Sequence, residues 1–196
     1  MKKRVLGLIL LYIGGISGIS DAQNLSDLKQ SISGFFVTTE RPQDYNAIIT
    51  WRQSAVELDG TYDAVIFHER ATIRSQNRPY NRQIWVLTAE DDSIMMRHYD
   101  ASNLAEGERP DGLALENFTY MPDLDLPLQY SDGVWKGTIE FVNPDYLSQF
   151  VEAAHSARVS LQIDSEGIVY HLAMYNTEGL HIYGPRERGY RLVRRD

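Results

Sequence analysis

Short apolar runs that alternate with polar residues recur along most of the chain, with turn residues between them. The runs that predict strands are Ala47 to Gln53, Leu58 to Glu69, Tyr80 to Leu87, Ser93 to Tyr99, Trp135 to Val142, Ala157 to Ile163, Gly167 to Tyr175, Leu180 to Tyr183 and Gly189 to Val193. A turn at 131–133 precedes the run that begins at Trp135, and the Gly-containing hairpin turns at 165–167 and 177–179 join neighbouring runs. About eight to ten short strands of this kind predict a mainly β fold, an antiparallel sheet that closes into a barrel of lipocalin-like size.

Few segments have the spacing of a helix. Apolar residues at helical spacing predict one short helix from Asn24 to Ile32. A second helix is predicted from Pro144 to His155, with Asn143 as its N-cap and Pro144 in the first turn. Residues 101–127 are rich in Gly, Pro and acids and predict a long excursion with a short helical stretch at 101–106. The pattern leaves open whether this excursion covers the barrel mouth.

The first 22 residues have the layout of a secretory signal peptide. A basic start at residues 2–4 precedes an uncharged, mostly apolar stretch from Val5 to Ile19, and Ser20 and Ala22 are the small residues expected before a cleavage site. The apolar stretch is short for a bilayer span, which makes a membrane anchor the weaker alternative. We therefore expect cleavage near Ala22, a single domain over residues 23–196 and a periplasmic or secreted protein that is not an integral membrane protein.

Composition and charge exclude several function classes. The chain of 196 residues has no cysteine, which excludes disulfides, thiolate metal sites and a cysteine nucleophile on this chain. Its net charge is −8, and cleavage near Ala22 would remove three basic residues and one acidic residue, so the mature chain is more acidic still. Nucleic acid is therefore not an expected partner. The five histidines show no His-Glu-x-x-His or His-x-His spacing, and we predict no metal site.

One carboxylate stands out as candidate chemistry. Glu69 lies on the same face of its predicted strand as Val65 and Phe67, and a carboxylate on an apolar face is costly unless it is paired or functional. Arg82 on the next strand can pair with it across the hairpin. Two interpretations stay open here, a structural ion pair at the barrel rim and a ligand-facing acid–base pair.

The same segment resembles the CpcT/CpeT family, the T-type chromophore lyases of phycobiliproteins. In that family an apolar strand that ends in an acid is followed by Pro-Tyr and an Arg-rich strand, and Glu69 and Pro79-Tyr80 match this order. The segment 96–99 resembles the following strand, and 182–192 resembles the closing signature. The chain departs from the family in having Asn81-Arg82-Gln83 where the family usually has Arg-Gln-Arg, which turns the arginine to the other strand face.

The resemblance implies a calycin-like barrel that attaches a linear tetrapyrrole (a bilin such as phycocyanobilin) to a cysteine of a phycobiliprotein subunit, with no permanently bound cofactor. It implies Glu69 as the acid that protonates the bilin. It further implies Tyr80 and Tyr99 as aromatic walls and hydrogen-bond donors, and Arg82 and Arg97 as partners of the propionates.

Two other classes of function stay open. One is a non-catalytic periplasmic binding protein for a hydrophobic or heterocyclic ligand, and the other is a barrel filled by its own side chains. A lyase needs Glu69 and at least one arginine directed into a cavity, a binding protein needs a cavity with aromatic walls, and a filled barrel has no cavity. A homodimer is compatible with each.

Overall fold

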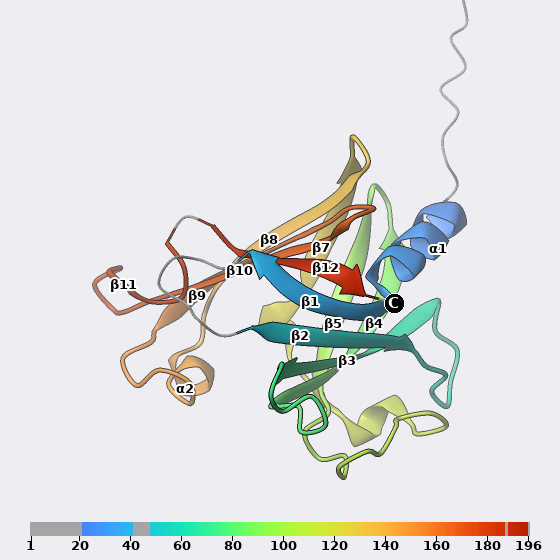
Figure 1. The fold of residues 1–196 in the computed structure, drawn as a ribbon, viewed down its shortest axis with the longest axis horizontal. Coiled ribbons are helices and arrows are strands. Elements are labelled where there is room, and N and C mark those ends of the chain that lie inside the picture. The colour runs from blue at the N-terminus through green and yellow to red at the C-terminus, as the bar shows by residue number, and fades with distance from the viewer. Residues whose placement is uncertain (1–20, 41–47, 187, 196) are drawn as a thin grey trace, which may run out of the picture.

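A computed structural model describes residues 21–40, 48–186 and 188–195 of the chain. Within them, ten strands form a closed antiparallel barrel, in the order β10-β12-β1-β2-β3-β4-β5-β7-β8-β9 and back to β10 (Figure 1). The barrel strands are β1 (Gly34–Glu40), β2 (Ile49–Ala55), β3 (Ala64–Thr72), β4 (Asn81–Glu90), β5 (Ser93–Asp100), β7 (Leu126–Ser131), β8 (Val134–Val142), β9 (Ser156–Ile163), β10 (Gly167–Tyr175) and β12 (Tyr190–Arg195). The predicted fold class, a mainly β antiparallel calycin-like barrel, is confirmed.

Helix α1 (Asp21–Ile32) closes one end of the barrel. Its apolar stripe of Leu25, Leu28 and Ile32 is buried among the interior side chains of the strands. Arg194 of the last strand donates to the carbonyls of Gln30 and Ser31, which are among the groups that a helix end leaves unpaired. The predicted helix is confirmed and begins three residues earlier than expected. In the described part of the chain, no helix has the length and apolarity that crossing a bilayer requires.

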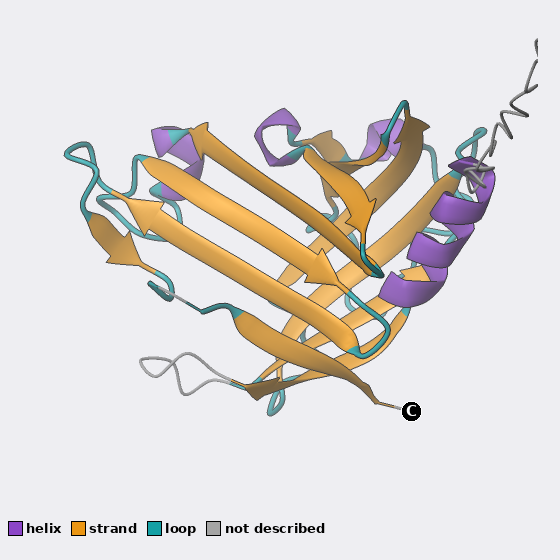
Figure 2. Cartoon of the chain, turned by 90° about the horizontal axis from the view of Figure 1, so that it is seen from above, coloured by secondary structure: helices purple, strands orange, loops and turns teal. Residues whose placement is uncertain are grey.

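The opposite end of the barrel is open and carries two short elements. Helix α2 (Pro144–Leu147) and strand β11 (His181–Tyr183) lie at this end, as Figures 1 and 2 show from two directions. The prediction of a helix through His155 is wrong. The chain continues after Leu147 in separate turns because the backbone N–H of His155 must pair with the carbonyl of Tyr175 to begin β9.

The excursion between β5 and β7 covers the outside of the barrel. Ala101, Leu104 and Phe118 pack with Val65 and Ile84 on the outer faces of β3 and β4. The segment forms turns, η1 (Leu115–Asn117), β6 (Thr119–Tyr120) and η2 (Pro122–Leu124), so the helix predicted at 101–106 is wrong. Its turns are held instead by its own backbone and by Arg82, which donates to the carbonyls of Ala105 and Ser102.

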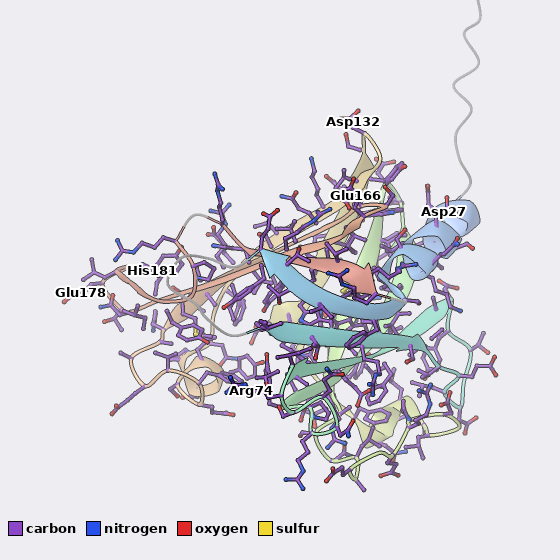
Figure 3. The ribbon with its side chains drawn as sticks, viewed as in Figure 1. Asp27, Arg74, Asp132, Glu166, Glu178 and His181 are labelled. Carbon is purple, nitrogen blue, oxygen red and sulfur yellow. The ribbon has the colours of Figure 1, made fainter. Side chains whose placement is uncertain are left out.

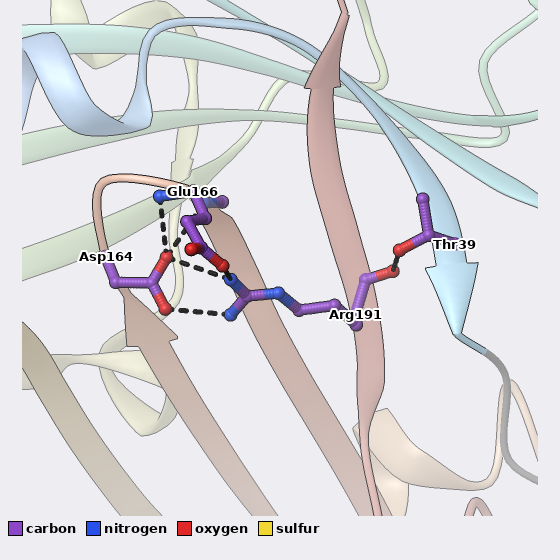
Figure 4. A network of polar contacts seen from close by, with 5 residues as sticks. Thr39, Asp164, Glu166 and Arg191 are labelled. Atoms are coloured by element: carbon purple, nitrogen blue, oxygen red, sulfur yellow. Dashed lines mark hydrogen bonds and ion pairs between the residues drawn. The ribbon is translucent and has the colours of Figure 1, made fainter.

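A charged network fastens β12 to the β9–β10 turn (Figure 4). Arg191 donates to both carboxylate oxygens of Asp164, at 2.8 and 3.0 Å, and more weakly to Glu166 at 3.3 Å. Burial alone would raise the pKa of Asp164, but the hydrogen bonds from Arg191 and from the turn backbone outweigh it and lower this pKa. The carbonyl of Arg191 accepts from the hydroxyl of Thr39 in β1, so the network joins three neighbouring parts of the wall.

Candidate functional site

The open end of the barrel contains a cavity of about 250 Å³. Strands β2, β3, β4, β5, β7, β8, β9, β10 and β12 contribute to its wall, and α2 and β11 contribute to its rim. Apolar side chains such as Ile139, Val159 and Leu172 form one side of it. The interior below the cavity is filled by a core that includes Leu28, Ile66 and Leu87 from α1, β3 and β4. The barrel is therefore a cup, plugged at the α1 end and hollow at the other.

Aromatic rings form another part of the cavity lining. Trp51 of β2 meets Tyr170 of β10 edge to face, with ring centroids 5.1 Å apart, and meets Trp85 of β4 at 6.1 Å. At the rim, Tyr146 of α2 contacts Phe150 edge to face at 5.2 Å. The N-cap of α2 places these two rings, because the side chain of Asn143 accepts from the backbone N–H of Tyr146.

One cation lies among these rings. The guanidinium of Arg70, the seventh residue of β3, sits 5.0 Å from the ring centroid of Trp51 and 4.6 Å from that of Tyr170. No carboxylate of the described residues forms an ion pair with it, and its buried Nε–H has no hydrogen-bond partner among them. Burial by itself lowers the pKa of Arg70, but the hydroxyls of Tyr170 and Tyr80 outweigh this and raise it. The arginine is therefore fully charged at neutral pH.

A buried polar cluster forms the floor of the cavity. Trp85 stacks on His68 at 4.2 Å and meets His98 edge to face at 5.5 Å, and its indole N–H donates to Gln83. Burial, assisted by the charge of Arg70, lowers the pKa of His68 well below its ordinary value. Burial lowers the pKa of His98 to about 4, against a smaller opposing effect of hydrogen bonds to the backbone. Both imidazoles are therefore neutral at pH 7.

The charge inside the cavity is opposite to that of the surface. No aspartate or glutamate of the described chain lines the cavity, and Arg70 is the cation that does. The acidic side chains of Asp27, Asp132 and Glu178 project outward instead (Figure 3). A ligand in this cup would meet one positive charge within an aromatic and aliphatic wall.

Of the five site residues that the resemblance implies, Tyr80 is the one that lines the cavity. This tyrosine lies on the rim, is 58% exposed, and hydrogen-bonds with Arg70. Glu69 is half-buried on the outer face of β3, opposite Arg52 and Arg82 in the neighbouring strands, and no ion pair joins it to either. Glu69 does not line this cavity, and Val65 and Phe67 on the same face of the strand pack against the 101–118 segment, so the role of Glu69 stays a prediction.

The remaining three residues also lie outside the barrel. Arg82 holds the carbonyls of the 101–118 segment, as described above, and Arg97 pairs with Glu90 at 2.5 Å. Tyr99 packs against Tyr120 of β6, with ring centroids 5.0 Å apart. The structure does not bring these residues together with Tyr80, and their roles in ligand binding stay predictions.

The comparisons with known proteins support the fold. No protein-family model matches the chain, and no curated protein matches its sequence. Among solved structures, the selenomethionine form of the CRL protein of Arabidopsis is similar, with a TM-score of 0.67 and 14% sequence identity over 90% of this chain and 100% of that one. At this identity, the similarity shows a common calycin-like barrel and nothing finer.

Proposed function

We propose that this protein is a non-catalytic binding protein that holds a small, flat, largely apolar molecule in the open end of its barrel. The observation that carries the proposal is the cup itself, with an aliphatic wall, an aromatic wall and a plugged bottom. A barrel with a purely structural role would be filled at both ends. Ligand sites are commonly concave, mostly apolar and furnished with a few polar groups, which matches this lining.

The lining favours binding over bilin transfer. A general acid has to lie within hydrogen-bond reach of the group that it protonates, and no carboxylate of the described residues lines the cavity. The volume of about 250 Å³ is also slightly below the range of roughly 300–1,000 Å³ that is typical for enclosing a drug-sized ligand. A linear tetrapyrrole would therefore insert one end only and leave the rest outside the mouth.

Bilin attachment is the second candidate function, and one observation favours it. Tyr80, from the Pro79-Tyr80 motif that resembles the CpcT/CpeT family, is on the cavity rim beside Arg70. In this function a bilin would enter the mouth with its propionate toward the arginine. Glu69, on the outer face of β3, would then act only on a part of the bilin that extends out of the mouth and reaches that face.

Binding is tested with a neutral fluorescent dye, N-phenyl-1-naphthylamine, on the purified chain. We expect saturable binding that Val159→Trp reduces at least about tenfold, because the indole occupies the cavity beside Ile139. Leu172→Phe adds less volume to the same part of the cavity and is a second, milder test variant. Val142→Trp is the matched control, because Val142 is 63% exposed and outside the cavity. Absence of saturable binding, or equal binding by the Val159 and Val142 variants, would contradict the proposal.

Spectral titration with phycocyanobilin, biliverdin and haem separates the two candidates. A red-shifted, saturable bilin spectrum that Glu69→Gln weakens would favour the second candidate. A bilin spectrum that is indifferent to Glu69→Gln would favour binding without transfer. If no tetrapyrrole changes its spectrum while the neutral dye binds, bilin chemistry is excluded for this chain.

We also propose that the protein is exported by cleavage after Ala22. Residues 1–20 lie outside the described residues, but the buried stripe of α1 begins at Leu25, so cleavage at this position removes the first two residues of the helix and keeps the buried stripe. Fractionation of a bacterial host that expresses the full chain, with mass spectrometry of the product, tests this. We expect a periplasmic form that begins at Gln23, and a cytoplasmic form with an uncleaved N-terminus would contradict it.

A further inference from the structure

We propose that the ligand of this cavity is an organic acid, an aromatic or heterocyclic carboxylate, whose anionic group pairs with Arg70. This inference rests on the proposed function and adds the chemical class of the ligand. It follows from the aromatic contacts of the guanidinium, from its missing carboxylate partner among the described residues and from the other residues that line the cavity.

The contacts of Arg70 fix the guanidinium without using all of its donors. The guanidinium lies over the rings of Trp51 and Tyr170, at 5.0 and 4.6 Å from their centroids, and the ring faces attract its positive charge without accepting conventional hydrogen bonds from its N–H groups. The hydroxyls of Tyr170 and Tyr80 take up part of the donor capacity. A guanidinium has five N–H donors, and the buried Nε–H finds no acceptor in the described chain.

This arrangement is costly unless a ligand completes it. A buried donor without a partner costs about 1–3 kcal/mol, and more when the group is charged. Other arginines of the barrel are satisfied by the protein itself, as Arg191 is by Asp164 and Arg97 is by Glu90. Arg70 differs from both in having no carboxylate partner among the described residues. A carboxylate is the acceptor that matches the guanidinium fork in geometry and charge.

The neighbours of Arg70 extend the same recognition. Asn81, the first residue of β4, is paired directly with Arg70 of β3 and also lines the cavity. Its side-chain oxygen is buried and has no hydrogen-bond partner among the described residues. This amide can accept from an N–H or O–H of the ligand next to its acid group. The rest of the lining is aromatic or aliphatic, which selects a flat apolar body behind the anionic end.

The test compares two probes of the same shape and different charge. Both 1-naphthoate and its neutral analogue 1-naphthamide are titrated against bound N-phenyl-1-naphthylamine. We expect the wild-type chain to bind the naphthoate at least about tenfold more tightly than the naphthamide, the preference expected of a hydrogen-bonded charge pair. Arg70→Met should abolish this preference, and Arg70→Lys, which keeps the charge but not the fork, should retain part of it.

The matched control is Arg52→Met, which removes an exposed arginine from the outer face of the neighbouring strand and should preserve the wild-type preference. Equal binding of the two probes by the wild-type chain would overturn the inference without any variant. So would a preference that survives in Arg70→Met. In both cases the neutral dye still binds and the proposed function stands. If the dye itself does not bind, the proposed function fails and this inference fails with it.

Discussion

The buried imidazole of His98 should make the barrel less stable as the solution becomes acidic. Its pKa is about 4 in the folded protein, against an ordinary value of 6.5, because burial penalises the charged form. Between these two values the unfolded chain binds a proton that the folded chain does not, so acid favours unfolding and stability rises with pH. The contribution of His98 to the free energy of unfolding should therefore fall by about 2 kcal/mol between pH 7 and pH 5, and by about 3 kcal/mol at pH 4. The buried His68, whose pKa is also lowered, adds a further loss in the same direction.

The assay is urea unfolding at a series of pH values from 8 to 4, followed by tryptophan fluorescence. Carboxylates contribute their own pH dependence, so the quantity to compare is the difference between wild type and His98→Gln at each pH. This difference should change by about 2 kcal/mol between pH 7 and pH 5, because glutamine does not titrate. The same exchange at His155, which precedes β9, gives the baseline for replacing a histidine by a glutamine. Parallel curves for wild type and His98→Gln would refute the reasoning.

Two further predictions concern the framework of the barrel. Arg191→Met should lower the free energy of unfolding by about 2 kcal/mol, because it leaves the half-buried carboxylate of Asp164 without its bidentate partner. The control Arg158→Met breaks an exposed ion pair and should lower the free energy of unfolding by less than about 1 kcal/mol. Equal losses for the two variants in urea unfolding would contradict this prediction. Gly184→Ala should lower the free energy of unfolding by about 3 kcal/mol or more, because the residue has a φ of +86° and an added Cβ would collide with a backbone carbonyl of β10. Gly179 has a φ of +75° but open space around it, so Gly179→Ala should lower the free energy of unfolding by only about 1 kcal/mol. Similar melting temperatures for the two alanine variants would show that the collision is relieved.

The closed barrel was predictable because its signals are local and repeated. Alternation in Ser93 to Tyr99 matches the buried and half-buried residues of β5, and the turn at 131–133 precedes β8 as expected, although β7 before that turn was not predicted. Helix α1 was predictable for the same reason, since its three buried residues are spaced one helical turn apart. Closure removes the two edge strands that an open sheet of these strands would expose.

Elements that depend on distant partners were not predictable. The segment from Pro144 has the composition of a longer helix, but β9 has to begin at residue 156 to pair with both β8 and β10. The excursion at 101–118 is polar and irregular in sequence, yet three of its residues complete an apolar layer on the outside of β3 and β4. The sequence pattern within each segment does not indicate which strands the segment contacts, and these contacts determine its conformation.

The site was missed for a related reason, which β3 shows best. Its residues Ala64 to His68 are all buried, because the core fills one face and the 101–118 segment covers the other. A strand buried on both faces loses the alternation that tells inside from outside. Glu69 and Arg70 are therefore equal candidates in the sequence, although they point to opposite sides of the wall.

The neighbouring strands contain part of the missing information. In β5 alternate residues are buried, and the two-residue turn at Asp91-Asp92 fixes the register between β4 and β5, which places Trp85 on the same inner face as His98. The next step, from β4 to β3, crosses a longer connection whose length does not fix the register. Only the pairing of Ile66 with Trp85, seen in the structure, carries the inner face on to Arg70. In a strand that is buried on both faces, a polar residue can thus be assigned to the cavity only if the register is known for every strand pair back to a strand with clear alternation. Here the register between β3 and β4 cannot be read from the sequence, so the assignment stops at β4.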